Sequence, residues 1–213
     1  MKTSDTPNAV LSLCVIDCSG SMIENDYPPT RLEAAKSACL ELVQVTAKQR
    51  PNDLVGIIGF DSDADLVVPL TPVTNTHAFH AGIQPLQPGY TTDFANALEL
   101  ASQVFAAQPN SAQPRSNFLR RQQPKHNRRI IFLSDGHHNG RGTPLSAVSM
   151  LKSSGIVIEC LGIGGTPQDV DERLMKLIAS TGPNGKPMYR FINDRKALLQ
   201  EFRKKALLKV IDD

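Results

Sequence analysis

Val15-Ile16-Asp17-Cys18-Ser19-Gly20-Ser21-Met22 is the stretch around which this chain is organised. It begins inside a short apolar run, 11–16, which is typical of a strand buried on both faces of a sheet. The run ends at the carboxylate of Asp17, and the hydroxyls of Ser19 and Ser21 follow at alternate positions. Aspartate and serine are also common in turns and helix caps, so the stretch alone fits a structural turn as well as a ligand site.

On either side of this stretch, apolar runs alternate with segments of helical periodicity. Further strands are predicted at 54–60, 64–70, 129–133, 156–163 and 188–192, and helices at 31–48, 74–86, 94–107, 144–153, 169–180 and 195–210. The connection between 54–60 and 64–70 is too short for a crossover, so these two strands should form an antiparallel hairpin. In helix 31–48 the charged residues should occupy the face opposite the apolar one. The order predicts an α/β fold: a Rossmann-like, doubly wound, mostly parallel sheet with one antiparallel edge strand and helices on both faces.

Length and composition indicate one ordinary globular domain. The chain has 213 residues without a repeat, linker or composition break, so we expect a single domain over 1–213 with its core at about 10–208. The net charge of +2 is too small to indicate a nucleic-acid or membrane partner by itself. Residues 1–9 lack the pattern of a signal peptide, and no apolar run approaches the roughly 20 residues of a membrane span. We therefore expect a cytoplasmic protein whose four cysteines are buried and reduced.

A second predicted strand, 129–133, also leads to a carboxylate, that of Asp135. The carboxyl ends of parallel strands lie on one edge of a sheet, so neighbouring central strands would bring Asp17 and Asp135 together. The turn before Phe94 can add the hydroxyl of Thr91 or Thr92 at the same edge. Two carboxylates placed together would repel each other unless a cation lay between them. The resulting set of oxygen ligands is the kind that Mg²⁺ prefers.

Three segments carry a resemblance to a known family. They are Asp17-Cys18-Ser19-Gly20-Ser21, which matches a DxSxS motif, the helix start 92–98, and the strand end 132–136. In these segments the chain resembles a von Willebrand factor type A (vWA) domain with a complete metal-ion-dependent adhesion site (MIDAS). Thr91 stands where the family usually has glycine, and we favour Thr92 as the coordinating threonine because the following Ala97-Leu98 keeps the family's register.

The resemblance implies roles for five residues. Ser19 and Ser21 would bind the metal directly, and Asp17 and Asp135 would act directly or through water. Thr92 would join them in the ligand-bound form. The implied cation is Mg²⁺, with Mn²⁺ or Ca²⁺ as alternatives.

The chemistry of this set favours binding over catalysis. Neutral hydroxyls leave the metal much of its charge and one open position, which an aspartate or glutamate of a partner protein can fill, as it does in the family. The expected function is a metal-dependent, adhesion-type protein-binding module whose specificity comes from the loops 24–30 and 137–143 and the Thr92 turn. We find no nucleophile with its base and no catalytic residue, so an enzyme is not expected. The alternative is a metal-dependent hydrolase or phosphate-processing subunit that uses the same cation.

The segment 108–129 is predicted to be a long basic loop. It carries six basic residues and no acidic one from Arg115 onward: Arg115, Arg120, Arg121, Lys125, Arg128 and Arg129. Arg115–Arg129 is therefore a candidate for gripping an acidic or phosphorylated partner, and a scaffold that binds through this loop is the third functional hypothesis. Nucleic acid is disfavoured because Phe118 is the loop's only aromatic residue.

Other motifs favour structural interpretations. The adjacent His137 and His138 could form a metal or acid/base pair, but neighbours on a loop rarely point at one ligand. The carboxylates of Asp61, Asp63 and Asp65 lack the glycine and closing glutamate of a calcium-binding loop, so they should form a solvated hairpin turn. No phosphate-binding glycine motif follows any strand.

Overall fold

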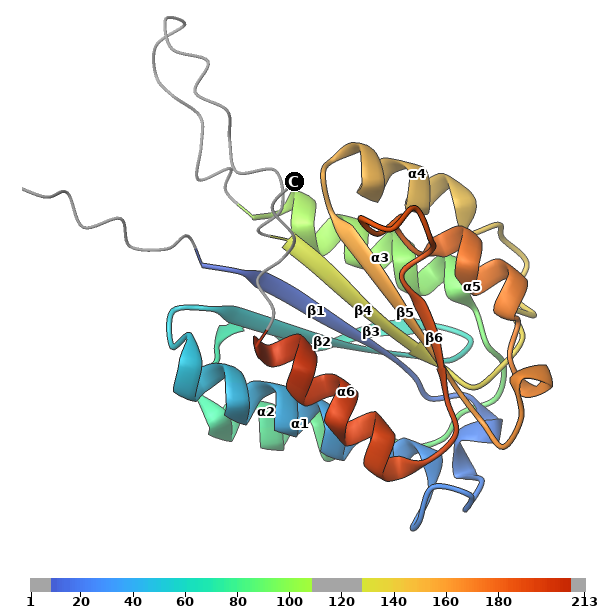
Figure 1. The fold of residues 1–213 in the computed structure, drawn as a ribbon, viewed down its shortest axis with the longest axis horizontal. Coiled ribbons are helices and arrows are strands. Elements are labelled where there is room, and N and C mark those ends of the chain that lie inside the picture. Colours follow the sequence, from blue (N-terminus) through green and yellow to red (C-terminus); the bar gives the residue numbers. More distant parts are fainter. Residues whose placement is uncertain (1–8, 109–127, 208–213) are drawn as a thin grey trace, which may run out of the picture.

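A computed structural model describes residues 9–108 and 128–207 of the chain. The described residues form a six-stranded sheet in the order β3-β2-β1-β4-β5-β6. The strands are β1 (Leu11–Asp17), β2 (Leu54–Phe60), β3 (Ala64–Pro72), β4 (Arg128–Ser134), β5 (Val157–Ile163) and β6 (Tyr189–Ile192). All neighbouring strands pair in parallel except β2 and β3, which form the antiparallel hairpin at one edge (Figure 1). The predicted Rossmann-like α/β fold is confirmed.

Helices cover both faces of this sheet. They are α1 (Arg31–Gln49), α2 (Thr76–Ile83), α3 (Phe94–Ala106), α4 (Leu145–Ser153), α5 (Glu172–Ile178) and α6 (Arg195–Leu207), and two short 3₁₀ turns are η1 (Gly20–Ile23) and η2 (Pro167–Asp169). Helices α1, α2 and α6 pack on one face, and α3, α4 and α5 pack on the other. The observed order of strands and helices matches the predicted one. Each continuous apolar run forms a strand, and each segment with helical periodicity contains a helix.

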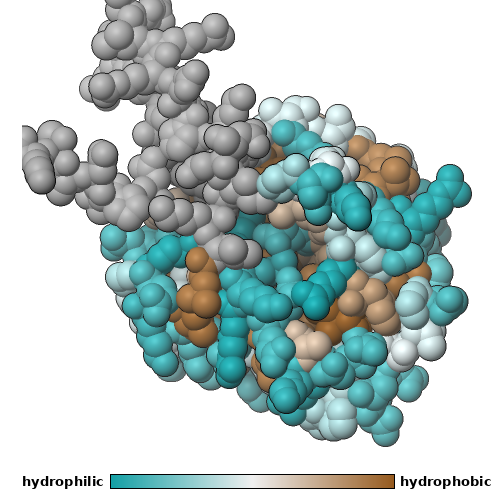
Figure 2. All heavy atoms as spheres, in the orientation of Figure 1, coloured by the Kyte–Doolittle hydropathy of each residue, from teal (hydrophilic) through white to brown (hydrophobic). Residues whose placement is uncertain are grey.

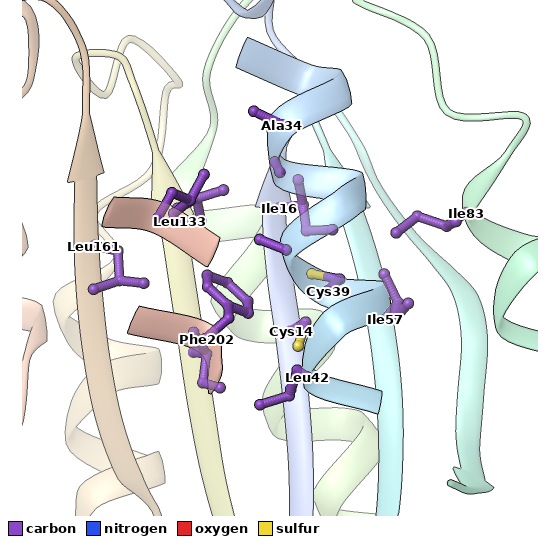
Figure 3. Packing of buried hydrophobic residues seen from close by; sticks show 14 of the residues in the cluster. Cys14, Ile16, Ala34, Cys39, Leu42, Ile57, Ile83, Leu133, Leu161 and Phe202 are labelled. Carbon is purple, nitrogen blue, oxygen red and sulfur yellow. The ribbon is translucent and has the colours of Figure 1, made fainter. Parts of the chain in front are cut away.

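The central strand β1 contributes side chains to both hydrophobic layers. Cys14 and Ile16 point toward α1 and α6, while Leu13 and Val15 point toward the opposite helices. Figure 3 shows Cys14 and Ile16 packed beneath Cys39 and Leu42 of α1. This two-sided burial explains why the sequence of β1 is a continuous apolar run rather than an alternating one.

The face of the molecule seen in Figure 2 is mainly hydrophilic, with separate hydrophobic patches. All four cysteines are buried and free, as expected. Among the described residues, no helix combines the length and apolar character needed to cross a membrane.

Three sequence predictions need correction. The charges of α1 do not all face solvent, because Arg31 and Lys36 are buried. The predicted helix 169–180 is divided into η2 and α5, since Val170 has an extended backbone and Asp171 caps a new helix by accepting a bond from the Leu174 N–H. The long loop also ends earlier than predicted, because residues 128 and 129 belong to β4.

Much of the predicted basic loop, residues 109–127, lies outside the described residues, as do 1–8 and 208–213. Of the loop's basic residues, Arg128 and Arg129 are described; Arg128 is half-buried and Arg129 is buried. Its Nε donates to Ser12 Oγ at 2.9 Å, and its guanidinium lies 3.9 Å from Glu159. Arg129 is therefore not part of an exposed basic surface.

Candidate metal centre

The two predicted aspartates lie at the carboxyl ends of neighbouring strands. β1 ends at Asp17, and Asp135 directly follows β4, its parallel neighbour in the sheet. Asp17 is completely buried, and each of its oxygens accepts a hydrogen bond, from the Ser19 N–H at 2.7 Å and from the Ser134 hydroxyl at 2.5 Å. These bonds fix the carboxylate at the edge of the sheet where β1 turns into η1.

The η1 turn brings the two serines of the motif toward Asp135. The hydroxyl oxygens of Ser19 and Ser21 are 3.2 Å apart, and the Ser21 hydroxyl donates to Asp135 Oδ1 at 2.8 Å. Sequence periodicity did not predict this 3₁₀ turn, because its four residues are too few to show a helical stripe.

Thr92 approaches the same point from the start of α3. A Cβ atom added to Gly136 would lie 3.1 Å from Thr92 Oγ1 and 3.8 Å from Asp17 Oδ2, so both oxygens border this glycine. Thr91 is exposed, and its hydroxyl donates to Ser62 Oγ at 2.7 Å. The geometry thus favours Thr92 over Thr91 as the threonine of the site.

A loop following Asp135 holds the backbone of Thr92 on both sides. Asn139 Oδ1 accepts from the Thr92 N–H at 2.8 Å, and the Asn139 N–H donates to the Thr92 carbonyl at 3.0 Å. His138 Nδ1 accepts from the Phe94 N–H at 3.2 Å, and its Nε2 lies 2.7 Å from the Gly142 carbonyl. Ser21 bonds to Asp135, and the loop after Asp135 bonds to Thr92. The η1 turn, the start of α3 and the loop after β4 are therefore connected by hydrogen bonds.

An open pocket of about 520 Å³ exposes these groups. It is lined by four of the five predicted ligands, namely Ser19, Ser21, Thr92 and Asp135, and Asp17 lies directly behind them. Tyr90, which is 90% exposed, also lines the pocket.

The electrostatics of the pocket suit a cation. Burial, together with the charge of Asp135, raises the pKa of Asp17 to about 7. Burial also raises the pKa of Asp135. Burial thus disfavours the ionised form of each carboxylate, and a bound divalent cation would stabilise that form. The donors are carboxylate and hydroxyl oxygens, which fit a hard cation such as Mg²⁺.

The other candidate groups do not converge in this way. His137 and His138 contact different carbonyls, those of Gln168 and Gly142. Within residues 9–108 and 128–207, no three His, Cys, Asp or Glu side chains are placed to hold a metal ion. The predicted ligand set has two carboxylates and three hydroxyls, and Glu24 and Asp169 also line the pocket.

Two further alternatives have structural roles in this part of the chain. The Asp61 and Asp63 backbones bond to each other in the turn between β2 and β3, as expected of a hairpin. Cys18 is buried, and burial raises the pKa of its thiol to about 12.

Sequence reasoning missed three residues that contact the predicted ligands: Arg31, Ser134 and Asn139. Arg31 Nη1 donates to Asp135 Oδ2 at 2.8 Å. One signal was available for Arg31, since a positive charge is unfavourable in the first turn of a helix and so indicates a nearby anion. Nothing in the sequence marked Ser134 and Asn139, because their partners lie 117 and 47 residues away.

Known proteins resemble the chain in both sequence and structure. A UPF0353 protein of Mycolicibacterium paratuberculosis is 39% identical over 100 residues, which are 46% of this chain and 28% of that protein. The crystal structure of the conserved hypothetical protein BatB from Bacteroides thetaiotaomicron superposes with a TM-score of 0.66 at 25% identity, covering 94% of this chain and all of that one. The chain spans less than half the length of the curated relatives it matches.

A third similar structure is proximal thread matrix protein 1 from the mussel byssus with a zinc-occupied MIDAS motif. It has a TM-score of 0.66 at 18% identity over 92% of this chain and 46% of that one, a likeness that shows the fold alone. The model of the von Willebrand factor type A domain matches residues 13–138, which include Asp17, Ser19, Ser21, Thr92 and Asp135. Since this match covers more than half of the sequence, the chain belongs to the von Willebrand factor type A domain family.

Proposed function

We propose that this chain is a metal-dependent protein-binding module. Asp17, Ser19, Ser21, Thr92 and Asp135 bind one divalent cation, Mg²⁺ or alternatively Mn²⁺ or Ca²⁺, and the cation captures an acidic side chain of a partner protein. The observation that carries the proposal is the meeting of two buried carboxylates with three hydroxyls at one open pocket. The family is one of modules often used for protein interaction, which supports the binding role.

The open pocket leaves room for a ligand from outside. Ser21 is exposed, whereas Asp17 is fully buried. A partner side chain would therefore reach a bound cation past Ser21, on the side away from Asp17. Hydroxyl ligands carry no charge, so the cation would keep enough positive charge to attract a carboxylate. The Ser21 hydroxyl does donate to Asp135, but Arg31 engages the other oxygen of that carboxylate, and we propose a binding site rather than an enzyme.

Two exposed hydrophobic side chains would contact the partner: Tyr90 lines the pocket, and Ile23 ends the η1 turn that carries Ser21. Tyr90 is 90% exposed, and Ile23 at the end of η1 is 62% exposed. Their loops meet where the Gly20 N–H donates to the Tyr90 carbonyl at 3.4 Å. We propose that the partner presents its acidic residue beside an apolar one, which packs against Tyr90 and Ile23.

The central experiment compares two adjacent threonines. Binding of Mg²⁺ should raise the melting temperature of the wild type, because a ligand that binds only the folded state stabilises it. Thr92→Ala should reduce this shift and the EDTA-sensitive capture of the partner, whereas Thr91→Ala should leave both unchanged because its hydroxyl bonds to Ser62. The absence of any metal response in the wild type would contradict the proposal. Turnover of phosphoesters that disappears in Asp135→Ala would favour the hydrolase instead.

The partner surface is tested separately. Tyr90→Ser should weaken partner capture without changing the Mg²⁺ shift, since Tyr90 supplies no ligand oxygen. Met150→Ser is the matched control, because Met150 is a 62% exposed apolar residue of α4 that does not line the pocket.

A further inference from the structure

Arg31 is a buried cation beside the candidate metal centre. It is the first residue of α1 and is 8% exposed. Its guanidinium forms a bidentate pair with Asp26, with Nε 2.8 Å from Oδ1 and Nη2 2.7 Å from Oδ2. The remaining terminal nitrogen, Nη1, donates to Asp135 Oδ2 at 2.8 Å, and Asp169 lies 3.7 Å from Nη2. The guanidinium therefore connects the loop before α1 with the carboxylate at the end of β4.

Helix stability does not explain this position. The amino end of a helix carries partial positive charge, so an arginine in the first turn is unfavourable there. Burying the guanidinium adds a desolvation cost that only well-placed anions offset. Asp26 and Asp135 supply those anions, and the pair with Asp135 lies in the pocket of the candidate metal centre.

The contacts of Asp135 divide its two oxygens between different partners. Oδ2 accepts from Arg31, and Oδ1 accepts from the hydroxyl of Ser21. The side chain of Asp135 is fully buried, so without Arg31 its charge would have no cationic partner among the contacts described here. Arg31 thus performs part of the neutralisation that a metal would perform.

We propose that Arg31 is the fixed counter-ion of the metal centre. It stabilises Asp135 when no cation is bound, and it keeps Oδ2 engaged so that only Oδ1 faces the serine hydroxyls. Its positive charge also opposes a divalent cation in the same pocket. Arg31 therefore lets the domain fold without metal and weakens its hold on the cation. This role rests on the proposed function, since it assumes that the pocket binds a cation.

The test measures metal-free stability and cation affinity in the same variants of the full chain. Arg31→Met should lower the melting temperature in EDTA and bind Mn²⁺ roughly fivefold or more tightly in calorimetry, because one repelling charge is gone. Adding Asp135→Asn to Arg31→Met should recover part of the lost melting temperature, because the buried side chain at position 135 then carries no charge that needs Arg31. Arg31→Lys keeps the charge, so its Mn²⁺ affinity should stay near that of the wild type, and this variant serves if Arg31→Met does not fold.

Arg129→Met is the matched control. Arg129 is another buried arginine, paired with Ser12 and Glu159 near the opposite end of β4. Its substitution should lower the melting temperature without changing Mn²⁺ affinity, and Asp135→Asn should not rescue it.

The outcomes separate the two proposals. Wild-type Mn²⁺ binding with unchanged or weaker affinity in Arg31→Met would overturn the counter-ion role alone. Failure of Asp135→Asn to rescue Arg31→Met would also overturn it, since Arg31 would then be a structural ion pair with other groups. An absence of Mn²⁺ binding in both the wild type and Arg31→Met would overturn the proposed function and this inference with it.

Discussion

At the scale of single residues, Asp17 links the stability of the fold to the cation. It is fully buried, and burial together with Asp135 raises its pKa to about 7. In the unfolded chain the pKa of an aspartate is about 3.9. Between these values the folded protein retains a proton that the unfolded chain has lost, so metal-free stability falls as pH rises through this interval.

The pH dependence gives a prediction for Asp17→Asn. In EDTA, the melting temperature of the wild type should be lower at pH 8 than at pH 5, and Asp17→Asn should reduce this difference because the amide does not titrate. Mg²⁺ should stabilise the wild type more at pH 8 than at pH 5, since the cation binds the deprotonated carboxylate. Thermal melts at the two pH values, with and without Mg²⁺, check both statements. Equal pH slopes for the two metal-free proteins would contradict the assignment to Asp17.

The placement of single residues could be predicted where they follow an apolar run, while their role as metal ligands stays a prediction. Asp17 and Asp135 each end a strand, and parallel pairing of β1 with β4 necessarily places their carboxylates on one edge. Arg31 was not predicted as part of the site, because its contact with Asp135 spans 104 residues and depends on how α1 packs over the sheet. Residues defined by strand ends are thus accessible to pattern reasoning, whereas those defined by helix packing are not.

At the scale of elements, the loop after β4 holds Thr92 in place. Asn139 makes both a side-chain and a backbone hydrogen bond to the Thr92 backbone. Asn139 is exposed and contributes no oxygen to the predicted ligand set. The main effect of Asn139 is therefore to hold Thr92 in position.

Removing the Asn139 side chain tests this positioning. Asn139→Ala should cost about 1 kcal/mol, the usual net value of one hydrogen bond, and so weaken Mg²⁺ binding by roughly fivefold. In EDTA its melting temperature should fall by roughly 2–4 °C, the shift that about 1 kcal/mol produces in a domain of this size. Asn184→Ala is the control, since Asn184 caps a different turn through the Lys186 N–H. Titration calorimetry measures both variants, and equal affinities for Mg²⁺ would contradict the positioning role.

Most element boundaries could be predicted from the sequence, but the break within the predicted helix 169–180 could not. Residues 169–180 offer two helix caps, Asp169 and Asp171, and the apolar pattern does not choose between them. In the structure Asp169 caps η2 through the Thr166 N–H, while Asp171 caps α5. The choice depends on the extended backbone of Val170, whose side chain is buried against the sheet.

At the scale of the whole molecule, the hydrophobic layers on both faces of the sheet reach the metal centre. Phe60, Phe94 and Phe132 form an aromatic cluster from β2, α3 and β4, with ring centroids 4.9–6.0 Å apart. Phe94 lies two residues after Thr92 and also contacts the His138 ring at 5.5 Å. The other layer reaches the site through Met22 of η1, which is buried in it, and through α1, whose first residue Arg31 contacts Asp135. Phe202 of α6 packs in this layer with Leu133 and Leu161 (Figure 3).

The general architecture followed from the sequence because each element has a clear period and only one hairpin was short enough to be antiparallel. The connection between the aromatic cluster and the site did not. Phe60 and Phe132 read as ordinary strand residues, and their meeting with Phe94 requires the observed order of β2, β1 and β4. Strand order is a long-range property that local periodicity does not contain.

Two phenylalanine substitutions can separate stability from metal binding. Phe94→Ala and Phe202→Ala each empty a fully buried site, so each should lower the free energy of unfolding by about 3–5 kcal/mol in urea titrations. In the folded fraction, Phe94→Ala should also weaken Mg²⁺ binding, because the start of α3 and His138 lose a packing partner. Phe202→Ala should keep the wild-type affinity, since Phe202 lies on α6, which contributes no residue to the lining of the pocket. Equal losses of affinity in the two variants would show that the site responds to global stability, and equal retention would show that the aromatic cluster does not support Thr92.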